Sequence, residues 1–298
     1  MGMTIATVVG KFLTFPYTTA HYLPQKSYKT TTQQGEDMAS KSGPDIIEDG
    51  LVLCLDAASK RSYPGTGTSF NDVAGANNAT LVNNISFDSE NAGVVTFDGT
   101  DDYLNVNAHA SNLIFAAPAT ISLWFKPLHA KNASTSRIIE LQSDGYRDTN
   151  ADSFRFDYGI GSSTTTDETF NIICSKDGQR NDNISLTRLK CIQYGYDYQN
   201  QWVHVCLTMD GSTWRLYLDT QIQSLYKSGY WNGNSLGDKF CGHFSQKTTV
   251  SIGRIEPSST GSAIYGGPWE MGNFQIYNRA LSLREIRRNY LSTKERFA

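Results

Sequence analysis

The strongest constraint on the fold is a two-residue alternation of apolar and polar side chains, which recurs in short segments along the chain. In "TISLWFKP" (residues 120–127), Ile121, Leu123 and Phe125 fall on one face of an extended chain. Successive side chains of a strand point to opposite faces, so one face of such a segment packs against a core. The same pattern occurs in "GLVLCLDA", "GVVTFDG", "WVHVCLTM", "WRLYLD", "TVSIGRI" and "NFQIYN". The sequence therefore predicts many short strands joined by turns.

The dipeptide Asp210-Gly211 lies between two of these segments, "WVHVCLTM" and "STWRLYLD". Asp-Gly supplies the positive φ angles of a two-residue hairpin turn, so we expect these strands to pair. Short antiparallel strands with almost no helical periodicity favour a sandwich, in which two sheets bury their inner faces against each other. We predict an all-β, two-sheet antiparallel jelly-roll sandwich.

One helix is expected near the C-terminal end. Ser282 is followed three residues later by Glu285, which is the spacing of a capping box. Leu281 and Ile286 flank the first turn and can pack together as a hydrophobic staple. The pattern predicts a short helix over about residues 283–291.

The first 45 residues hold no alternation long enough to make a domain. Their segment "TIATVVGKFLTFPYTTAHYL" is rich in β-branched and aromatic residues, and Lys11 is its clear charge. Such a segment is suited to bury apolar surface in a groove or against a sheet edge. We expect residues 1–45 to form an N-terminal arm that anchors the chain to neighbouring subunits. The alternative is an arm that covers a sheet edge of its own domain, which is predicted to span residues 46–298.

Charge and cysteine content exclude several classes of partner and site. A formal net charge of −3 gives no bulk attraction for nucleic acid or an anionic membrane, so we expect neither as a partner. The sequence shows no signal peptide and no apolar run near the ~20 residues that cross a bilayer, which favours synthesis in the cytoplasm. The cysteines are odd in number and lack C-x-x-C spacing, so buried free thiols are expected rather than zinc ligands or disulfides. They are Cys54, Cys174, Cys191, Cys206 and Cys241.

Several blocks of the sequence carry a resemblance to a known family. They are the opening stretch from "GPDIIEDGLVLCLDAASK" to "DVAGANNATLVNN", then "VTFDGTDDYLNV", "ATISLWFKP", "QWVHVCLTMDGSTWRLYLD" and "NFQIYNRALSLREIRRNYLS". Together they resemble a laminin-G-like, concanavalin A-like jelly-roll domain over about residues 43–298. The opening block is especially similar to versions found in structural proteins of tailed bacteriophages. The resemblance implies a fold but no single activity, because this sandwich serves lectins, glucanases, adhesins and capsid proteins.

The segment "VTFDGTDDYLNV" gathers Asp98, Asp101 and Asp102 around Gly99. These residue types commonly make a tight turn whose carboxylates accept hydrogen bonds from backbone amides, and we favour this interpretation. The alternative is a calcium site, because calcium takes about six to eight oxygen ligands and these carboxylates supply several. Members of the resembled family with a calcium site often carry an acidic pair where this chain has Gly272-Asn273. This departure disfavours the metal.

No catalytic residue is predicted. Laminarinase-type enzymes of the resembled fold carry an E-x-D-x-x-E strand whose carboxylates point into one cleft, and this sequence has no such strand. It also lacks the H-E-x-x-H motif. His204 falls within a predicted strand and is interpreted as a structural residue. We therefore expect a protein that is not an enzyme.

Three segments are rich in aromatic residues: "YGYDYQN" (residues 194–200), "SGYWNGNSLG" (228–237) and "IYGGPWEMG" (264–272). We expect these rings to be exposed, so that they can stack on sugar faces while nearby Asn and Asp side chains bind hydroxyls. The same residue types anchor protein interfaces, so protein contact is the competing interpretation. The candidate sugar-binding residues are Tyr196, Tyr230, Trp231, Asn232 and Trp269.

Three functions from different classes remain. The first, favoured by the phage-like opening block and the arm, is a non-catalytic structural or decorating protein of a bacteriophage particle. It would be located in the virion and contact other virion proteins and itself as a homo-oligomer. The second is a carbohydrate-binding adhesin that recognises cell-surface glycans, favoured by the aromatic segments. The third, a glycan-cleaving enzyme, has no catalytic constellation to support it.

Overall fold

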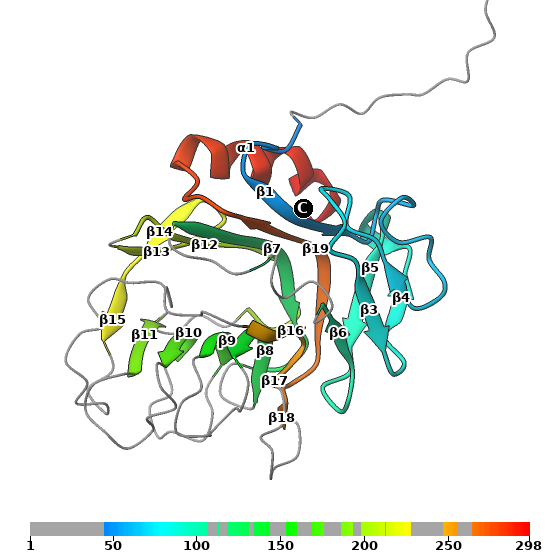
Figure 1. The fold of residues 1–298 in the computed structure, drawn as a ribbon, viewed down its shortest axis with the longest axis horizontal. Helices are drawn as coiled ribbons and strands as arrows, with labels where there is room; N and C mark the ends of the chain where they lie inside the picture. Colours follow the sequence, from blue (N-terminus) through cyan, green and yellow to red (C-terminus); the bar gives the residue numbers. More distant parts are fainter. Residues whose placement is uncertain are drawn as a thin grey trace, which may run out of the picture. The chain divides into compact units, whose positions relative to one another are not determined.

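The computed structural model describes residues 45–106, 113, 118–130, 134–143, 153–159, 168–175, 186–192, 198–211, 213–227, 247–255 and 264–298. These residues form two β-sheets that pack face to face, with one α-helix on the outside (Figure 1). The predicted class, a two-sheet antiparallel sandwich with a C-terminal helix, is confirmed. The arm lies outside the described residues except for Asp45, and its anchoring role stays a prediction. No helix in these ranges is long and apolar enough to span a bilayer.

Sheet A contains eight strands among the described residues, and its strand pairs are antiparallel. In spatial order they run β14-β13-β12-β7-β19-β5-β4, and β1 also pairs with β19. Their bounds are β14 Gln221–Gln223, β13 Trp214–Leu218, β12 Val203–Met209, β7 Ala119–Pro127, β19 Trp269–Tyr277, β5 Val94–Phe97, β4 Ser86–Asp88 and β1 Leu51–Asp56.

Sheet B contains nine strands in the same part of the chain, again antiparallel. Its order is β15-β11-β10-β9-β8-β16-β6-β3-β2. The strands are β15 Leu225–Lys227, β11 Leu186–Ile192, β10 Glu168–Ser175, β9 Ser153–Gly159, β8 Thr135–Ser143, β16 Lys247–Ile252, β6 Tyr103–Asn105, β3 Ala79–Val82 and β2 Ser69–Phe70. A separate pair joins β17 Arg254–Ile255 to β18 Ile264–Tyr265, and short 3-10 helices occupy η1 Glu90–Ala92 and η3 Lys294–Arg296.

The long strand β19 brings distant parts of the chain together. One of its edges pairs with β7, and the other is divided between β5 and β1. Trp269 pairs with Phe97 of β5, whereas Asn273 pairs with Asp56 of β1. The register is irregular around Gly272, where one partner gives way to the other. The first strand of the domain therefore lies beside its last strand.

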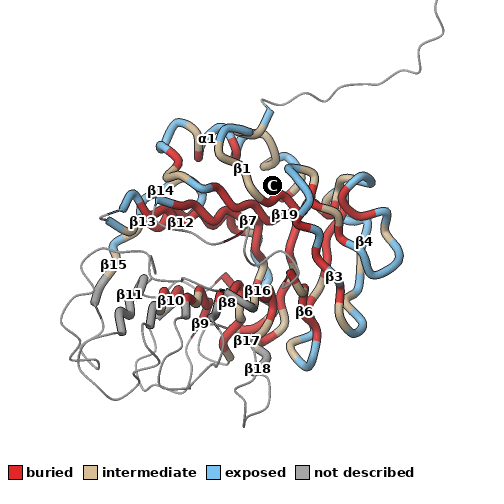
Figure 2. Tube along the Cα trace, viewed as in Figure 1, coloured by how far each residue is buried: buried red, intermediate tan, exposed pale blue. Residues whose placement is uncertain are grey.

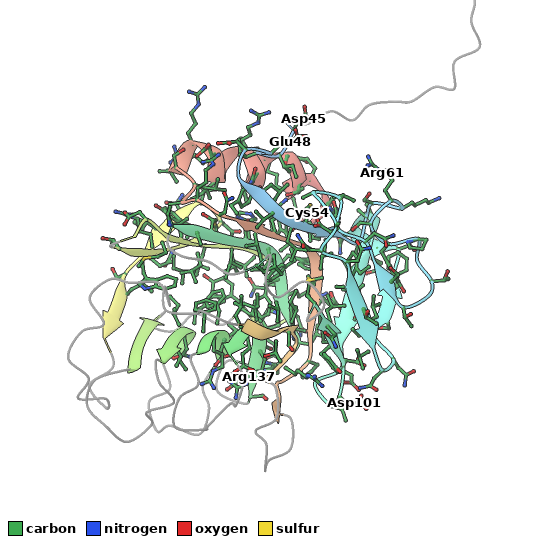
Figure 3. The ribbon with its side chains drawn as sticks, in the orientation of Figure 1. Asp45, Glu48, Cys54, Arg61, Asp101 and Arg137 are labelled. Atoms are coloured by element: carbon green, nitrogen blue, oxygen red, sulfur yellow. The ribbon has the colours of Figure 1, made fainter. Side chains whose placement is uncertain are left out.

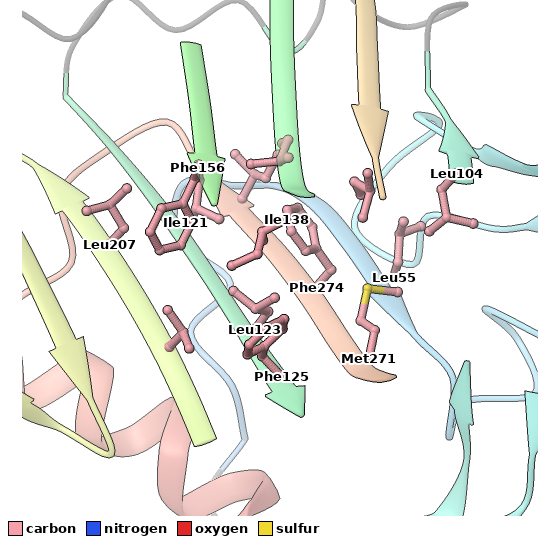
Figure 4. Close-up of a cluster of buried hydrophobic side chains, with 14 of the residues drawn as sticks. Leu55, Leu104, Ile121, Leu123, Phe125, Ile138, Phe156, Leu207, Met271 and Phe274 are labelled. Atoms are coloured by element: carbon pink, nitrogen blue, oxygen red, sulfur yellow. The ribbon is translucent and has the colours of Figure 1, made fainter. Parts of the chain in front are cut away.

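Side chains from the two sheets meet in one large core. Figure 2 shows the buried residues concentrated between the two layers. The inward face predicted for residues 120–127 is confirmed, because Ile121, Leu123 and Phe125 are each at most 1% exposed. Figure 4 shows them packed against side chains of both sheets, among them Leu55, Leu207, Met271 and Phe274 from sheet A and Leu104, Ile138 and Phe156 from sheet B.

The outer face of sheet A is also covered, by the helix α1 (Leu283–Thr293). The predicted capping box is confirmed: the Glu285 amide donates to Ser282 Oγ at 3.4 Å, and the Ser282 amide donates to Glu285 Oε2 at 2.8 Å. Leu281 and Ile286 lie in one apolar cluster, as the staple predicts. Through this cluster the helix packs against the sheet. Its buried members are Cys206, Tyr217, Tyr277, Leu281 and Ile286.

Strands β12 and β13 pair as a hairpin, as predicted, but the prediction of a two-residue turn between them is wrong. Met209 pairs with Trp214, which leaves four residues in the loop. Gly211 has the expected positive φ, at +98°. The Asp210 carboxylate accepts a hydrogen bond from the Thr213 amide at 2.9 Å. This side-chain contact closes a wider loop, so a two-residue turn is not needed to hold the strands.

Candidate functional site

The acidic turn joins β5 to β6 and carries Asp98, Asp101 and Asp102. Its Gly99 has φ +76°, and a Cβ there would lie only 2.5 Å from the carbonyl oxygen of Gly266. Both the left-handed backbone and the close approach require glycine. Asp101 is labelled at the tip of this turn in Figure 3. The turn is therefore fixed against the segment that precedes β19.

Backbone amides hold two of the three carboxylates. The Asp102 side chain accepts hydrogen bonds from the amides of Asp98 and Asn84, each at 3.1 Å. The Asp98 side chain accepts from the amide of Thr100 at 2.7 Å and from that of Asp101 at 3.3 Å. Asp102 is only 3% exposed, whereas Asp98 and Asp101 are exposed. This is the geometry of a hydrogen-bonded turn that fixes where β5 ends and β6 begins.

The surroundings shift the pKa values of two of these carboxyl groups in opposite directions. Burial raises the pKa of Asp102, and the neighbouring charge of Asp98 adds to the rise, although the amide hydrogen bonds oppose it. Burial also acts to raise the pKa of Asp98, but the amides of Thr100 and Asp101 help to outweigh it, and the net pKa lies below its usual value. The amides therefore supply much of the charge compensation that this cluster needs.

A calcium ion fits this cluster only in part. One oxygen from each aspartate lies within 4.8 Å of the others, which is close enough to share a cation. Calcium needs about six to eight oxygens, however, and both oxygens of Asp102 already accept amide hydrogen bonds. The hydrogen-bonded turn accounts for the arrangement of the carboxylates, and calcium binding here stays a prediction.

The position at which related domains carry an acidic pair is filled by packing in this chain. A Cβ on Gly272 would lie 2.2 Å from the ring of Phe297, so the aromatic ring sits directly against the backbone. The Asn273 side chain accepts a hydrogen bond from the Trp124 amide at 3.2 Å and is 4% exposed. Neither residue presents a carboxylate, and the site is occupied by an aromatic cluster.

Among the candidate sugar-binding residues, Trp269 is placed in the core, which corrects the expectation that it is exposed. It is 1% exposed, and its ring stacks on Phe97 with centroids 4.4 Å apart. The register explains this, because Trp269 is the direct cross-strand partner of Phe97 and both rings point between the sheets. A sugar stacks on an exposed ring face, and Trp269 has none. The other candidates, Tyr196, Tyr230, Trp231 and Asn232, lie outside the described residues and remain predictions.

A charged cluster on the outer face of sheet B was missed by the sequence reasoning. Arg137 Nη1 lies 2.7 Å from Asp157 Oδ2, and Arg155 Nε lies 2.9 Å from the same oxygen. Figure 3 labels Arg137 on this side of the sheet. The signal was present in "SFRFDYG" (residues 153–159), where aromatic and charged residues alternate. The aromatic set faces the core, so the charged set faces outward.

Register extends this charged cluster across neighbouring strands. Glu140 pairs with Arg155 on one side and with Ser251 on the other, and Asn171 pairs with Asp157. Glu140, Asn171 and Ser251 are each at most 2% exposed, and so is Asp157. Buried charges that are paired in this way stabilise a defined geometry, and breaking one pair leaves the other charge uncompensated. The cluster is thus a structural ion-pair network rather than an accessible cleft.

A Ser–His contact lies beneath α1. Ser122 Oγ and His204 Nε2 are 3.1 Å apart, and both residues are at most 2% exposed. Burial lowers the pKa of His204 to about 3, so the ring is neutral near pH 7. A nucleophile needs access to its substrate, and this pair has none. The structural role predicted for His204 accords with this position.

Comparisons with known proteins agree on the fold. Residues 98–287 match the family described as the concanavalin A-like lectin/glucanases superfamily. No curated protein sequence matches the chain. The receptor binding domain of botulinum neurotoxin C/D mosaic serotype is similar in structure, with a TM-score of 0.51 and 15% identity over 81% of this chain and 51% of that chain. Trypanosoma rangeli sialidase has a TM-score of 0.51 and 16% identity over 83% of this chain and 33% of that chain.

These two solved structures are longer than the region they share with this chain, which spans about half of the first and a third of the second. At such low identities the likeness concerns the fold alone. The family match is stronger, because it covers more than half of the sequence and runs through β7, β12, β13 and β19. The chain belongs to the concanavalin A-like lectin/glucanase superfamily.

Proposed function

We propose that the chain is a non-catalytic structural or decorating protein of a bacteriophage particle, anchored by its N-terminal arm and displaying a lectin-like sandwich. In this proposal it is made in the host cytoplasm and resides in the virion, in contact with other virion proteins and further copies of itself. Two sequence features support it: the similarity of the opening block to structural proteins of tailed phages, and the apolar, weakly charged arm.

The structural observation that carries the proposal is the position of Asp45, the last residue of the arm. Its carbonyl accepts a hydrogen bond from Arg288 Nε at 2.6 Å, and the nearby Ile47 amide donates to Asn289 Oδ1 at 2.8 Å. Both contacts fix the junction to α1, on the outer side of sheet A. An anchor that ends at this junction is therefore joined to a residue that α1 holds in place.

Carbohydrate binding is the second candidate function. It is supported by membership of a superfamily that includes lectins. It is also supported by the placement of the remaining candidates in the chain, because Tyr196 follows β11 and Trp231 follows β15. Both strands belong to sheet B, the sheet that α1 does not cover. A glycan-cleaving enzyme has less support, since Asp102 and Asp157 are engaged by amides and arginines.

The anchoring proposal is tested by deleting residues 1–42 and examining purified particles by mass spectrometry, followed by a density map that locates the chain. We expect the truncated protein to be soluble and folded, and to be missing from particles that contain the full-length chain. Normal incorporation of the truncated protein would contradict the anchor, and so would its failure to fold. Absence of the full-length chain from particles would overturn the virion assignment itself.

The carbohydrate proposal is tested by screening the full-length protein against a glycan array. Loss of binding in Trp231→Ala and Asn232→Ala, with binding retained in Gln221→Ala, would support the proposal. Gln221 is the control because it is exposed on β14 of the other sheet. Binding that survives both substitutions would remove these residues from the site, and the absence of any bound glycan would remove the function.

A further inference from the structure

The exposed large apolar side chains gather on one side of the domain. Within the described ranges they are Ile222, Leu283 and Leu291, which are 63%, 37% and 46% exposed. The two leucines lie on α1, eight residues apart, and so share one helix face. Ile222 pairs with Tyr217, whose ring packs in the cluster beneath α1, so Ile222 lies on the same outer side of sheet A. Exposed apolar side chains that lie together can mark a contact surface, and the two leucines line one groove.

Arginines surround the two leucines. Leu283, Arg284, Arg287, Arg288 and Leu291 line a shallow groove of about 390 Å³ along α1. Arg284 and Arg287 are exposed and form no ion pair or hydrogen bond with the described part of the chain. Arg284 also lies in the first turn of the helix, where the macrodipole disfavours a positive charge. Both arginines are therefore available to a group outside the described part of the chain.

Negative charges lie directly beside this basic groove. A second groove, of about 330 Å³, lies between α1 and residues 45–49, and Arg288 lines both grooves. Asp45 and Glu48 are exposed there, and their carboxylates pair with no described residue. Figure 3 labels both residues where the first described segment meets α1. Unpaired charges of both signs therefore adjoin each other next to exposed leucines.

We propose that this side of the domain, named here the α1 surface, is the contact between two copies of the chain related by a two-fold axis. Such an interface joins one surface to itself, so each charged group must find its complement on the same surface of the other copy. Arg284 and Arg287 of each copy would face Asp45 and Glu48 of its partner, with the leucines covered between them. The α1 surface comprises Asp45, Glu48, Ile222, Leu283, Arg284, Arg287, Arg288 and Leu291.

A second copy fits this surface better than an acidic partner of another kind. An acidic partner would satisfy the arginines but would oppose Asp45 and Glu48, and like charges across an interface are costly. A second copy satisfies both signs. A stable dimer buries about 800 Å² on each partner, which is more than one short helix offers. Ile222 on β14 and residues 45–49 extend the contact beyond α1.

The test is reciprocal charge reversal in the full-length chain, with mass measured by sedimentation equilibrium over a range of concentrations. One variant carries Arg284→Glu and Arg287→Glu, and the other carries Asp45→Lys and Glu48→Lys. Each variant alone places like charges opposite each other, and we expect its self-association to weaken on the order of tenfold or more. Mixing the two variants restores opposite charges at every contact, so the mixture should associate as tightly as the unaltered chain.

Two further variants complete the design. Lys60→Glu with Arg61→Glu changes the charge by the same amount in residues that line neither groove, and it should leave association unchanged. Leu291→Ser removes an exposed apolar contact and should weaken association without charge reversal. Thermal unfolding of each variant checks that the domain is folded, and Leu291→Ser tests the surface should a charge-reversed variant not fold.

Three results would overturn the inference: a chain that is monomeric at every concentration, association that survives both charge reversals, or a mixture that fails to associate. This inference stands apart from the proposed attachment to a particle, because it is measured on the purified chain alone. A dimer that never enters particles would refute the virion assignment and leave the α1 surface intact.

Discussion

The ring of Phe297 stacks on the indole of Trp124, with ring centroids 4.6 Å apart and an interplanar angle of 25°. Trp124 lies on the outer face of β7, and Phe297 follows η3 near the end of the chain. Trp202 contacts the same ring, with centroids also 4.6 Å apart. The C-terminal residues therefore complete the cover over sheet A that α1 begins.

Replacing Phe297 by Ala should lower the free energy of unfolding by about 2–4 kcal/mol, because it removes a stacked ring and leaves a cavity beside Gly272. Urea titration followed by tryptophan fluorescence measures the effect. Ala298→Ser alters an exposed neighbour and serves as the control, for which no change is expected. Equal stability of Phe297→Ala and the unaltered chain would show that the stack contributes nothing.

Two glycines with positive φ should differ in their sensitivity to substitution. Gly211→Val should cost about 1–2 kcal/mol, because valine resists the backbone conformation although its side chain meets nothing within 4 Å. Gly99→Val should cost more, since its side chain would also collide with the backbone of Gly266. Denaturant midpoints of the two variants provide the comparison. A larger loss of stability in Gly211→Val than in Gly99→Val would mean that the acidic turn can adjust to a side chain at residue 99.

Removing the Asp102 side chain should destabilise the domain by about 1–3 kcal/mol, because two backbone amides lose their buried acceptor. Asp101→Ala is the matched control, since its side chain is exposed and its carbonyl, not its carboxylate, accepts a hydrogen bond from Asn83. Thermal denaturation of both variants measures the difference. Similar losses in the two variants would contradict the role assigned to the hydrogen bonds of Asp102.

Calcium should have little effect on stability if the acidic turn is held by its own amides. A ligand that binds only the folded state raises the unfolding temperature, and the rise grows with the logarithm of the ligand concentration above its Kd. We expect the same midpoint with excess calcium and with a chelator. A rise in the presence of calcium that disappears in Asp98→Asn would establish the metal site instead.

The buried His204 should make the domain less stable in mild acid. Burial lowers its pKa from the usual value of 6.5 to about 3, so below pH 6.5 the unfolded chain binds a proton that the folded chain does not. Stability is fully present above pH 6.5 and falls by up to about 1.4 kcal/mol per pH unit as the pH decreases. Measurements above pH 4.5 avoid most of the titration of Glu285, whose pKa is lowered from 4.5 to about 2, chiefly by its hydrogen bonds with Arg279. His204→Gln should flatten the slope in this pH range, and an unchanged slope would assign it to another group.

Local signals in the sequence were sufficient for several elements. The capping box of Ser282 and Glu285 fixed the start of α1, because all of its partners lie within one turn. The alternation around Leu123 identified β7 in the same way. The length of the turn at Asp210 was harder to predict, because it depends on a hydrogen bond between the Asp210 side chain and the amide of Thr213.

Long-range pairing limited what could be predicted about the candidate site. Trp269 follows a glycine- and proline-containing turn, which resembles an exposed loop until β19 is paired with Phe97 of β5. The ion pairs of Asp157 likewise depend on the register between β8 and β9, to which no local pattern points. Alternation indicates that a strand has two different faces, but it does not reveal what covers the polar face.

The contacts of Asp45 with Arg288 and of Phe297 with Trp124 place both ends of the described domain on the outer side of sheet A. A fluorescent protein or affinity tag fused at either end of residues 45–298 would consequently project from the side that carries α1. The same arrangement suits the insertion of residues 45–298 into a surface loop of another protein, because an inserted domain needs its two ends on one side.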